Sequence, residues 1–79
     1  MKNPTGVKAF GTHIRILREG QNLSQQELAD LADLAKTTIQ RIENAKFSVT
    51  IDVMISISRA LAIPMQKLVD FSLPKEKTK

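Results

Sequence analysis

The sequence lacks several residues on which whole classes of protein depend. Its 79 residues contain no cysteine, no tryptophan and no tyrosine, and only one histidine. Without cysteine there is no disulfide framework, no thiol nucleophile and no thiolate zinc site. A metal site would have to rest on carboxylates, which do not cluster suitably, so no cofactor is expected. With three glycines and three prolines, the shortage of turn formers and of aromatic strand formers favours an all-helical fold.

Long apolar runs are missing as well. No segment approaches the roughly 18 consecutive apolar residues of a membrane span. The first residues, MKNPTG, lack the apolar run of a signal peptide. We therefore expect a cytoplasmic protein without a membrane partner. The length predicts one small domain, with no room for a separate ligand-binding domain and hence no small-molecule effector.

The charge is unbalanced toward the positive. Twelve lysines and arginines against eight acidic residues give a net charge of +4, and the pI is about 9.8. On so small a domain this charge favours an anionic partner such as nucleic acid, although many basic proteins bind nothing anionic. An enzyme is not expected. The sequence shows no nucleophile-and-base pair, no paired carboxylates in a plausible cleft and no phosphate-binding glycine loop.

Apolar periodicity and end signals predict five helices in one domain over residues 7–72. Residues 1–6 are expected to form an arm, because Pro4 and Gly6 interrupt regular structure, and residues 73–79 a charged tail. Ser24 and Glu27 form an S-x-x-E capping box at the start of the second helix. The helices are expected at about 7–20, 25–32, 36–44, 51–62 and 64–71, with Thr50 as the N-cap of the fourth.

The same periodicity predicts the core. The residues expected to face it are Phe10, Ile14, Leu17, Leu28, Ala29, Ala32, Leu34, Ile39, Ile42, Ile51, Met54, Ile57 and Leu61. The helix over 51–62 also has Val53 and Ile55 off this stripe. It is either a central helix covered on most sides, or Val53, Ile55, Phe71 and Leu73 help to bury a subunit interface.

The predicted helix over residues 36–44 has one polar face. On a 3.6-residue period, the side chains at positions 36, 37, 40, 41 and 44 lie opposite Ile39 and Ile42. They are a lysine, a threonine, a glutamine, an arginine and an asparagine. Arginine or lysine can donate two hydrogen bonds to guanine, glutamine can pair with adenine, and the threonine methyl can contact thymine. Taken alone, a solvated surface is the commoner explanation of such a face.

The spacing around this face resembles the Cro/CI-type, or XRE-like, helix-turn-helix DNA-binding family. Ala29 is the small residue where two helices cross, Asp33 is the turn residue, and Ile39 and Ile42 are the apolar anchors. FGTHIRILREGQNLSQQELADLA is similar to the family's first helix, loop and second helix. TTIQRIENAK is similar to its recognition helix and exit, and IDVMISISRALAIPMQKLV to its last two helices. The resemblance covers about 60 of the 79 residues.

This resemblance implies a compact five-helix bundle of the lambda-repressor-like type, whose second and third helices form the helix-turn-helix. It further implies a sequence-specific transcriptional regulator in a prokaryotic or phage setting, associated with the nucleoid through DNA. Such a regulator would act as a homodimer on a pseudo-palindromic site in double-stranded DNA. A protein-interaction module, or an antitoxin-like subunit that binds a partner, remains the alternative on the same fold.

The resemblance also assigns roles to individual residues. The base-reading positions and their flanks are Lys36, Thr37, Thr38, Gln40 and Arg41. The residues expected to contact the DNA backbone are Gln25, Asn44 and Lys46, and Gln25 is also expected to brace the recognition helix. Arg18 and Glu43 match a structural ion pair between the first and third helices.

Three positions depart from the family pattern. Asp33 stands where the family has a glycine in the turn, and Ala35 stands where it has a serine cap. Asp tolerates left-handed geometry better than most residues, whereas Ala35 loses a capping hydrogen bond worth about 1 kcal/mol. Ala45 replaces the glycine after the third helix, so Asn44 is expected to supply the left-handed residue there.

Overall fold

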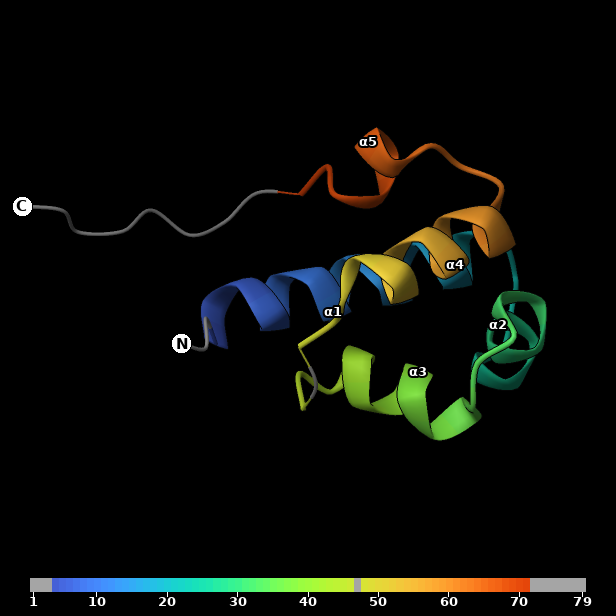
Figure 1. Ribbon diagram of the computed structural model, residues 1–79, viewed down its shortest axis with the longest axis horizontal. Coiled ribbons are helices and arrows are strands. Elements are labelled where there is room, and N and C mark those ends of the chain that lie inside the picture. The colour runs from blue at the N-terminus through green and yellow to red at the C-terminus, as the bar shows by residue number, and fades with distance from the viewer. Residues whose placement is uncertain (1–3, 47, 72–79) are drawn as a thin grey trace, which may run out of the picture.

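The computed structural model describes residues 4–46 and 48–71, and these form five α-helices and no strand. The helices are α1 (Pro4–Gly20), α2 (Gln25–Ala32), α3 (Lys36–Glu43), α4 (Ile51–Leu61) and α5 (Met65–Leu68). This confirms the all-helical prediction. In Figure 1, α3 lies along one long side of the molecule and α5 along the other, with α1 and α4 between them. The predicted tail, Leu73 and the first three residues of the predicted arm lie outside the described residues.

The first helix begins three residues before its predicted start. Pro4 is its first residue, and the fixed φ of proline suits the first turn of a helix, where no backbone N–H is needed. Gly6 is accommodated within that turn. Residues 4–6 therefore belong to α1, and the prediction of an arm is wrong for them.

The N-terminal caps of α2 and α4 are those predicted. The Glu27 backbone N–H donates to Ser24 Oγ at 3.0 Å, and the Ser24 N–H donates to Glu27 Oε1 at 2.7 Å. Thr50 Oγ1 accepts the Val53 N–H at 3.3 Å. At the start of α3, Ala35 makes no side-chain cap, as its methyl group requires. Helix α3 therefore starts without the stabilisation that α2 and α4 have.

Four helices end in the same left-handed turn without a glycine. Asn22, Asp33, Ala45 and Ala62 have φ between 57° and 60°. After each of them, the next backbone N–H donates to the carbonyl five residues earlier, at 3.1, 2.8, 2.7 and 3.0 Å. This is the Schellman arrangement, in which glycine is the usual residue. Asn44 has φ −95°, so the prediction that it supplies the left-handed residue after α3 is wrong.

The core lies where the four longer helices and α5 converge. The fully buried large side chains are Ile14, Leu28, Ile39, Ile42, Ile57, Leu61 and Leu68, and Phe10 and Ala29 complete the cluster. Leu17, Leu34 and Met54 pack against it, as predicted. No helix in the described part of the chain is long and apolar enough to cross a membrane.

Two predictions for α4 are wrong. Ile51, predicted to be core, is 60% exposed, and Val53, predicted to lie off the core stripe, packs against the core. At 100° per residue, Val53, Ile57 and Leu61 point in similar directions, and Ile51 points roughly 120° away from their mean. The apolar periodicity admitted two stripes on α4, and the packing of α2 and α5 against this helix selects one of them.

The α1–α3 contact is unusually close. Gly11 on α1 is buried, and a Cβ built on it would overlap the carbonyl oxygen of Ile42 on α3. A glycine is needed here because backbone meets backbone with no room for a methyl group. This contact helps to fix α3, the helix with the predicted DNA-binding face, against the rest of the domain.

Candidate nucleic-acid interface

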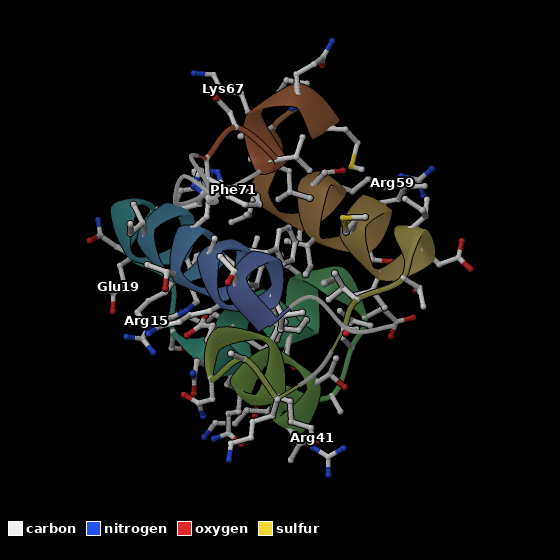
Figure 2. All side chains as sticks on the ribbon, turned by 90° about the vertical axis from the view of Figure 1, so that its left-hand side faces the viewer. Arg15, Glu19, Arg41, Arg59, Lys67 and Phe71 are labelled. Atoms are coloured by element: carbon white, nitrogen blue, oxygen red, sulfur yellow. The ribbon has the colours of Figure 1, made fainter. Side chains whose placement is uncertain are left out.

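Helix α3 has one fully buried face and one face open to solvent. Ile39 is 0% and Ile42 1% exposed on the inner face. Of the five residues predicted to face outward, Lys36, Thr37, Arg41 and Asn44 are exposed, whereas Gln40 is half-buried. In Figure 2, Arg41 projects from α3 away from the body of the molecule. The structure thus presents these hydrogen-bonding side chains on one short helix.

The remaining predicted site residues surround this face. Thr38 and Gln40 are half-buried at its edges, and Lys46 is exposed just after the helix. Gln25 is the first residue of α2 and is half-buried. Its Nε2 donates to Glu43 Oε1 at 3.0 Å, so it joins the start of α2 to the last residue of α3.

The turn between α2 and α3 sets the angle of this surface. Asp33 adopts the left-handed conformation, with φ 58° and ψ 45°, and its N–H donates to Asp30 O at 3.3 Å. The Leu34 N–H donates to Ala29 O at 2.8 Å, which closes the turn. Leu34 packs against the core, and α3 begins two residues later at Lys36. A tight turn of this kind lets the second helix protrude into a groove while the first crosses the backbone.

An ion pair holds the end of α3 against α1. Arg18 Nε donates to Glu43 Oε2 at 2.7 Å and Arg18 Nη2 donates to Glu43 Oε1 at 3.0 Å, as the resemblance implied. Arg18 Nη1 also donates to the Leu23 carbonyl at 2.7 Å. The Glu43 side chain is fully buried and that of Arg18 is 10% exposed. One arginine thus ties together α1, the loop before α2, and α3.

The pair also shifts the proton affinities of both groups. Burial pushes the pKa of Glu43 upward, but the hydrogen bonds from Arg18 and Gln25 and the charges of Arg18 and Arg15 outweigh it. The pKa of Glu43 therefore lies below its ordinary value. The hydrogen bond with Glu43 raises the pKa of Arg18 despite some loss from burial. Both groups are charged at neutral pH, which is the state the bidentate geometry needs.

One cation beside this pair was missed by the sequence analysis. Arg15 on α1 has its Nε 3.6 Å from Glu43 Oε1, and its side chain is 47% exposed. Arg15 precedes Arg18 by three residues, a spacing that places both on one side of a helix. That spacing could have pointed to Arg15 once Arg18 was assigned to the pair.

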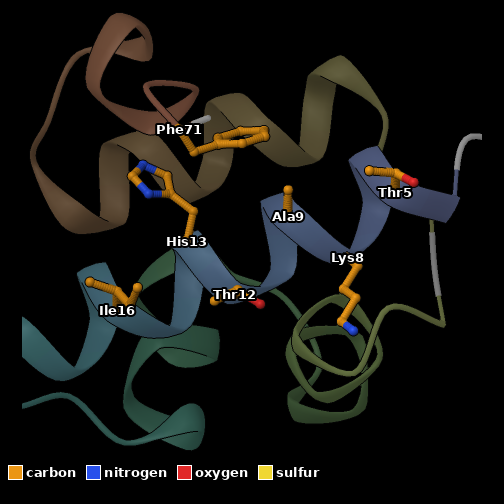
Figure 3. Close-up of a pocket in the computed structure, with 7 residues that line it drawn as sticks. All are labelled: Thr5, Lys8, Ala9, Thr12, His13, Ile16 and Phe71. Carbon is orange, nitrogen blue, oxygen red and sulfur yellow. The ribbon is translucent and has the colours of Figure 1, made fainter. Parts of the chain in front are cut away.

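A shallow groove lies elsewhere on the molecule (Figure 3). It has a volume of about 520 Å³ and is lined by Thr5, Lys8, Ala9, Thr12, His13, Ile16 and Phe71. The Phe71 ring lies 5.4 Å from that of His13 and 6.1 Å from that of Phe10. The groove includes no residue of α3. In the described residues no group of three or more histidines and carboxylates is placed to hold a metal ion.

These features define a class of protein. A helix-turn-helix with an exposed polar recognition face, on an all-helical domain, is the architecture of a DNA-binding regulator. A family model described as helix-turn-helix matches residues 14–68, and the chain belongs to this family. The family is one of transcriptional regulators and not of enzymes.

Comparisons with single proteins agree with this family membership. The chain is 38% identical over 64 residues to the control protein C.BamHI of Bacillus amyloliquefaciens, covering 80% of this chain and 79% of that protein. The fold is similar to that of the restriction-modification controller protein C.AhdI from Aeromonas hydrophila. That similarity has a TM-score of 0.77 at 29% identity and covers 78% of this chain and 94% of the other.

A more distant structure shares the fold alone. The clp gene regulator ClgR from C. glutamicum matches with a TM-score of 0.78 at 19% identity, over 85% of this chain and 87% of the other. The arrangement of the five helices is therefore common to proteins that share few residues with this one.

Proposed function

We propose that the protein is a homodimeric transcriptional regulator that binds a pseudo-palindromic operator, with α3 of each protomer in a major groove. Lys36, Thr37 and Arg41 contact base edges, and Thr38 and Gln40 flank them. Gln25, Asn44 and Lys46 contact the DNA backbone. The family membership supports DNA binding, and the exposure of Lys36, Thr37, Arg41, Asn44 and Lys46 leaves these side chains open to contact DNA.

One observation carries this proposal: the contrast between the two faces of α3. Ile39 and Ile42 are buried to 1% exposure or less, whereas Lys36, Thr37, Arg41 and Asn44 are exposed. Gln25 and Arg18 hold the C-terminal end of the same helix through Glu43. A helix that is held so firmly and that presents exposed hydrogen-bond donors is preorganised to contact base edges.

The small size of the surface supports the proposed dimer. One eight-residue helix contacts only a few base pairs. Two copies related by a two-fold axis place two such helices in successive major grooves, roughly 34–36 Å apart, and multiply the specificity.

The named relatives favour one biological setting. A control protein at 38% identity and a restriction-modification controller with the same fold at 29% identity support a role in controlling restriction-modification genes. A phage repressor or an antitoxin-like autoregulator would use the same fold and the same face of α3.

Selection of random duplex DNA by the purified protein, near physiological salt, tests the proposal. Enrichment of an inverted repeat is the expected result, and the spacing of its halves gives the separation of the two α3 helices. Salt-sensitive binding without any enriched sequence would overturn the proposal. It would favour the alternative, a subunit whose main role is to bind a protein partner.

A further inference from the structure

Arg15 lies beside the buried Glu43 carboxylate without forming a hydrogen bond to it. The 3.6 Å between Arg15 Nε and Glu43 Oε1 is beyond hydrogen-bond distance. Both oxygens of Glu43 are already occupied: Oε1 accepts from Arg18 Nη2 and Gln25 Nε2, and Oε2 accepts from Arg18 Nε. Glu43 therefore attracts the Arg15 guanidinium and leaves its N–H donors available.

The position of Arg15 is as informative as its free donors. Arg15 and Gln25 approach the same oxygen, Glu43 Oε1, at 3.6 and 3.0 Å. Gln25 is the first residue of α2, the helix that crosses the DNA backbone when a helix-turn-helix docks. The half-exposed guanidinium of Arg15 is thus held at the place where a phosphate is expected. In Figure 2, Arg15 projects from the flank of α1, and Arg59 of α4 projects on the opposite side.

The geometry points to Arg15 as a DNA phosphate-binding residue, which shares one backbone phosphate with Gln25 at the start of α2. This inference rests on the proposed function. The forked donors of arginine match two phosphate oxygens, and the Glu43 charge reduces the freedom that Arg15 loses on binding. Glu19 is the acidic neighbour of the site. Its carboxylate is 3.8 Å from Arg18 Nη2 and 62% exposed, so it weakens the attraction for phosphate without occupying Arg15.

Equilibrium binding over a series of salt concentrations tests the assignment. The probes are a duplex of random sequence and the duplex enriched by selection. Arg15→Gln is expected to lower the affinity for both duplexes about tenfold, because a phosphate contact carries no sequence information. The magnitude of the slope of log affinity against log salt is expected to fall by about one per protomer, because one phosphate contact is lost. Arg15→Lys, which keeps the charge and loses the fork, should keep the slope and lose part of the affinity.

The matched control is Arg59→Gln, which removes the same charge from the opposite side of the molecule. It should keep the wild-type affinity and slope, and an equal loss in both variants would overturn the assignment.

If Arg15→Gln does not fold, as thermal unfolding would show, Glu19→Gln decides instead. Removing this acidic neighbour should tighten binding at low salt, and unchanged binding would overturn the assignment. No DNA binding by the wild type would reject the proposed function itself, whereas wild-type binding with an unchanged Arg15→Gln slope would reject the role of Arg15 alone.

Discussion

Arg18 on α1 and Glu43 on α3 form a bidentate ion pair, with hydrogen bonds of 2.7 and 3.0 Å and a fully buried carboxylate. The two residues are 25 positions apart in the chain. Because Gln25 donates to the same carboxylate, the pair also joins the start of α2 to the end of α3, which are the two ends of the DNA-binding motif. The stability of the domain and the placement of its recognition helix depend on the same few atoms.

Breaking the Arg18–Glu43 pair should be costly. Arg18→Met leaves the buried Glu43 charge without its partner, and we expect a loss of about 3–5 kcal/mol in the free energy of unfolding. Urea unfolding followed by circular dichroism measures it. The double variant Arg18→Met with Glu43→Leu should recover much of this loss, since neither charge then remains buried. A loss below about 1 kcal/mol in the single variant would show that the pair is no stronger than a surface one.

The pair should also make stability depend on acidity. Because the pKa of Glu43 is lower in the folded protein than in the unfolded chain, its contribution is complete above the unfolded pKa, about 4.3. The contribution is lost as pH falls from there through the folded pKa. The urea midpoint of the wild type should therefore drop in this range. In Glu43→Gln, which cannot titrate, this part of the pH dependence should be absent, and an identical acid profile in both proteins would contradict the account.

Two glycines of α1 should respond oppositely to the same substitution. Gly11→Ala places a methyl group against the Ile42 carbonyl and should lower the free energy of unfolding by about 1–3 kcal/mol or more. Gly20→Ala meets nothing within 4 Å and should be neutral or stabilising by up to about 1 kcal/mol. Thermal unfolding of the two variants measures both. Equal effects would show that α3 moves freely away from α1.

Replacing an alanine in a left-handed turn by glycine should stabilise the protein. Ala62 ends α4 with φ 57°, where a Cβ is strained, so Ala62→Gly should stabilise the protein by roughly 1 kcal/mol. The matched control is Ala9→Gly in the interior of α1, which should destabilise by about the same amount because glycine is a poor helix former. The unfolding midpoints of the two variants should thus move in opposite directions, and a loss in both would contradict the strain at Ala62.

Base and backbone contacts should separate by their sequence dependence. Arg41→Ala should cost about 1–3 kcal/mol of binding to the selected duplex and relax the preference at one base position. Lys46→Ala should weaken all sequences alike and lower the salt slope by about one. Binding of both variants to a panel of single-base operator variants makes the comparison. A uniform loss for Arg41→Ala would remove it from the base-reading residues.

Much of the fold could be predicted because its signals are local. The Ser24–Glu27 capping box and the Thr50 cap each involve residues three positions apart, and both fall where the sequence placed them. The start of α1 could not be placed, because Pro4 fits the first turn of a helix as well as it fits an arm. Ala45 shows another limit: packing and the hydrogen bond from Lys46 N–H to Arg41 O impose a left-handed turn on a residue that disfavours it.

The candidate site divides in the same way. The outward residues of α3 follow from helical periodicity, and the structure exposes Lys36, Thr37, Arg41 and Asn44 but leaves Gln40 half-buried. Helical spacing places Arg15 on the same side of α1 as Arg18, but it gives Arg15 no role, because that role depends on Glu43, 28 positions away, and on Gln25 at the start of another helix. Burial of Ile51 was wrongly predicted because two apolar stripes on α4 were compatible with the sequence, and only the packing of α2 and α5 distinguishes them.

The contact of Gly11 with Ile42 bears on which partner must adapt when the protein binds DNA. Where two helices meet through side chains, rotamer changes allow one to shift against the other. Here the backbones touch, so α3 cannot slide along α1 without losing the contact. In the proposed dimer, a mismatch between the spacing of the two α3 helices and that of the two half-sites would be absorbed by bending or twisting of the DNA. The base steps between the half-sites would then contribute to the choice of operator through their flexibility.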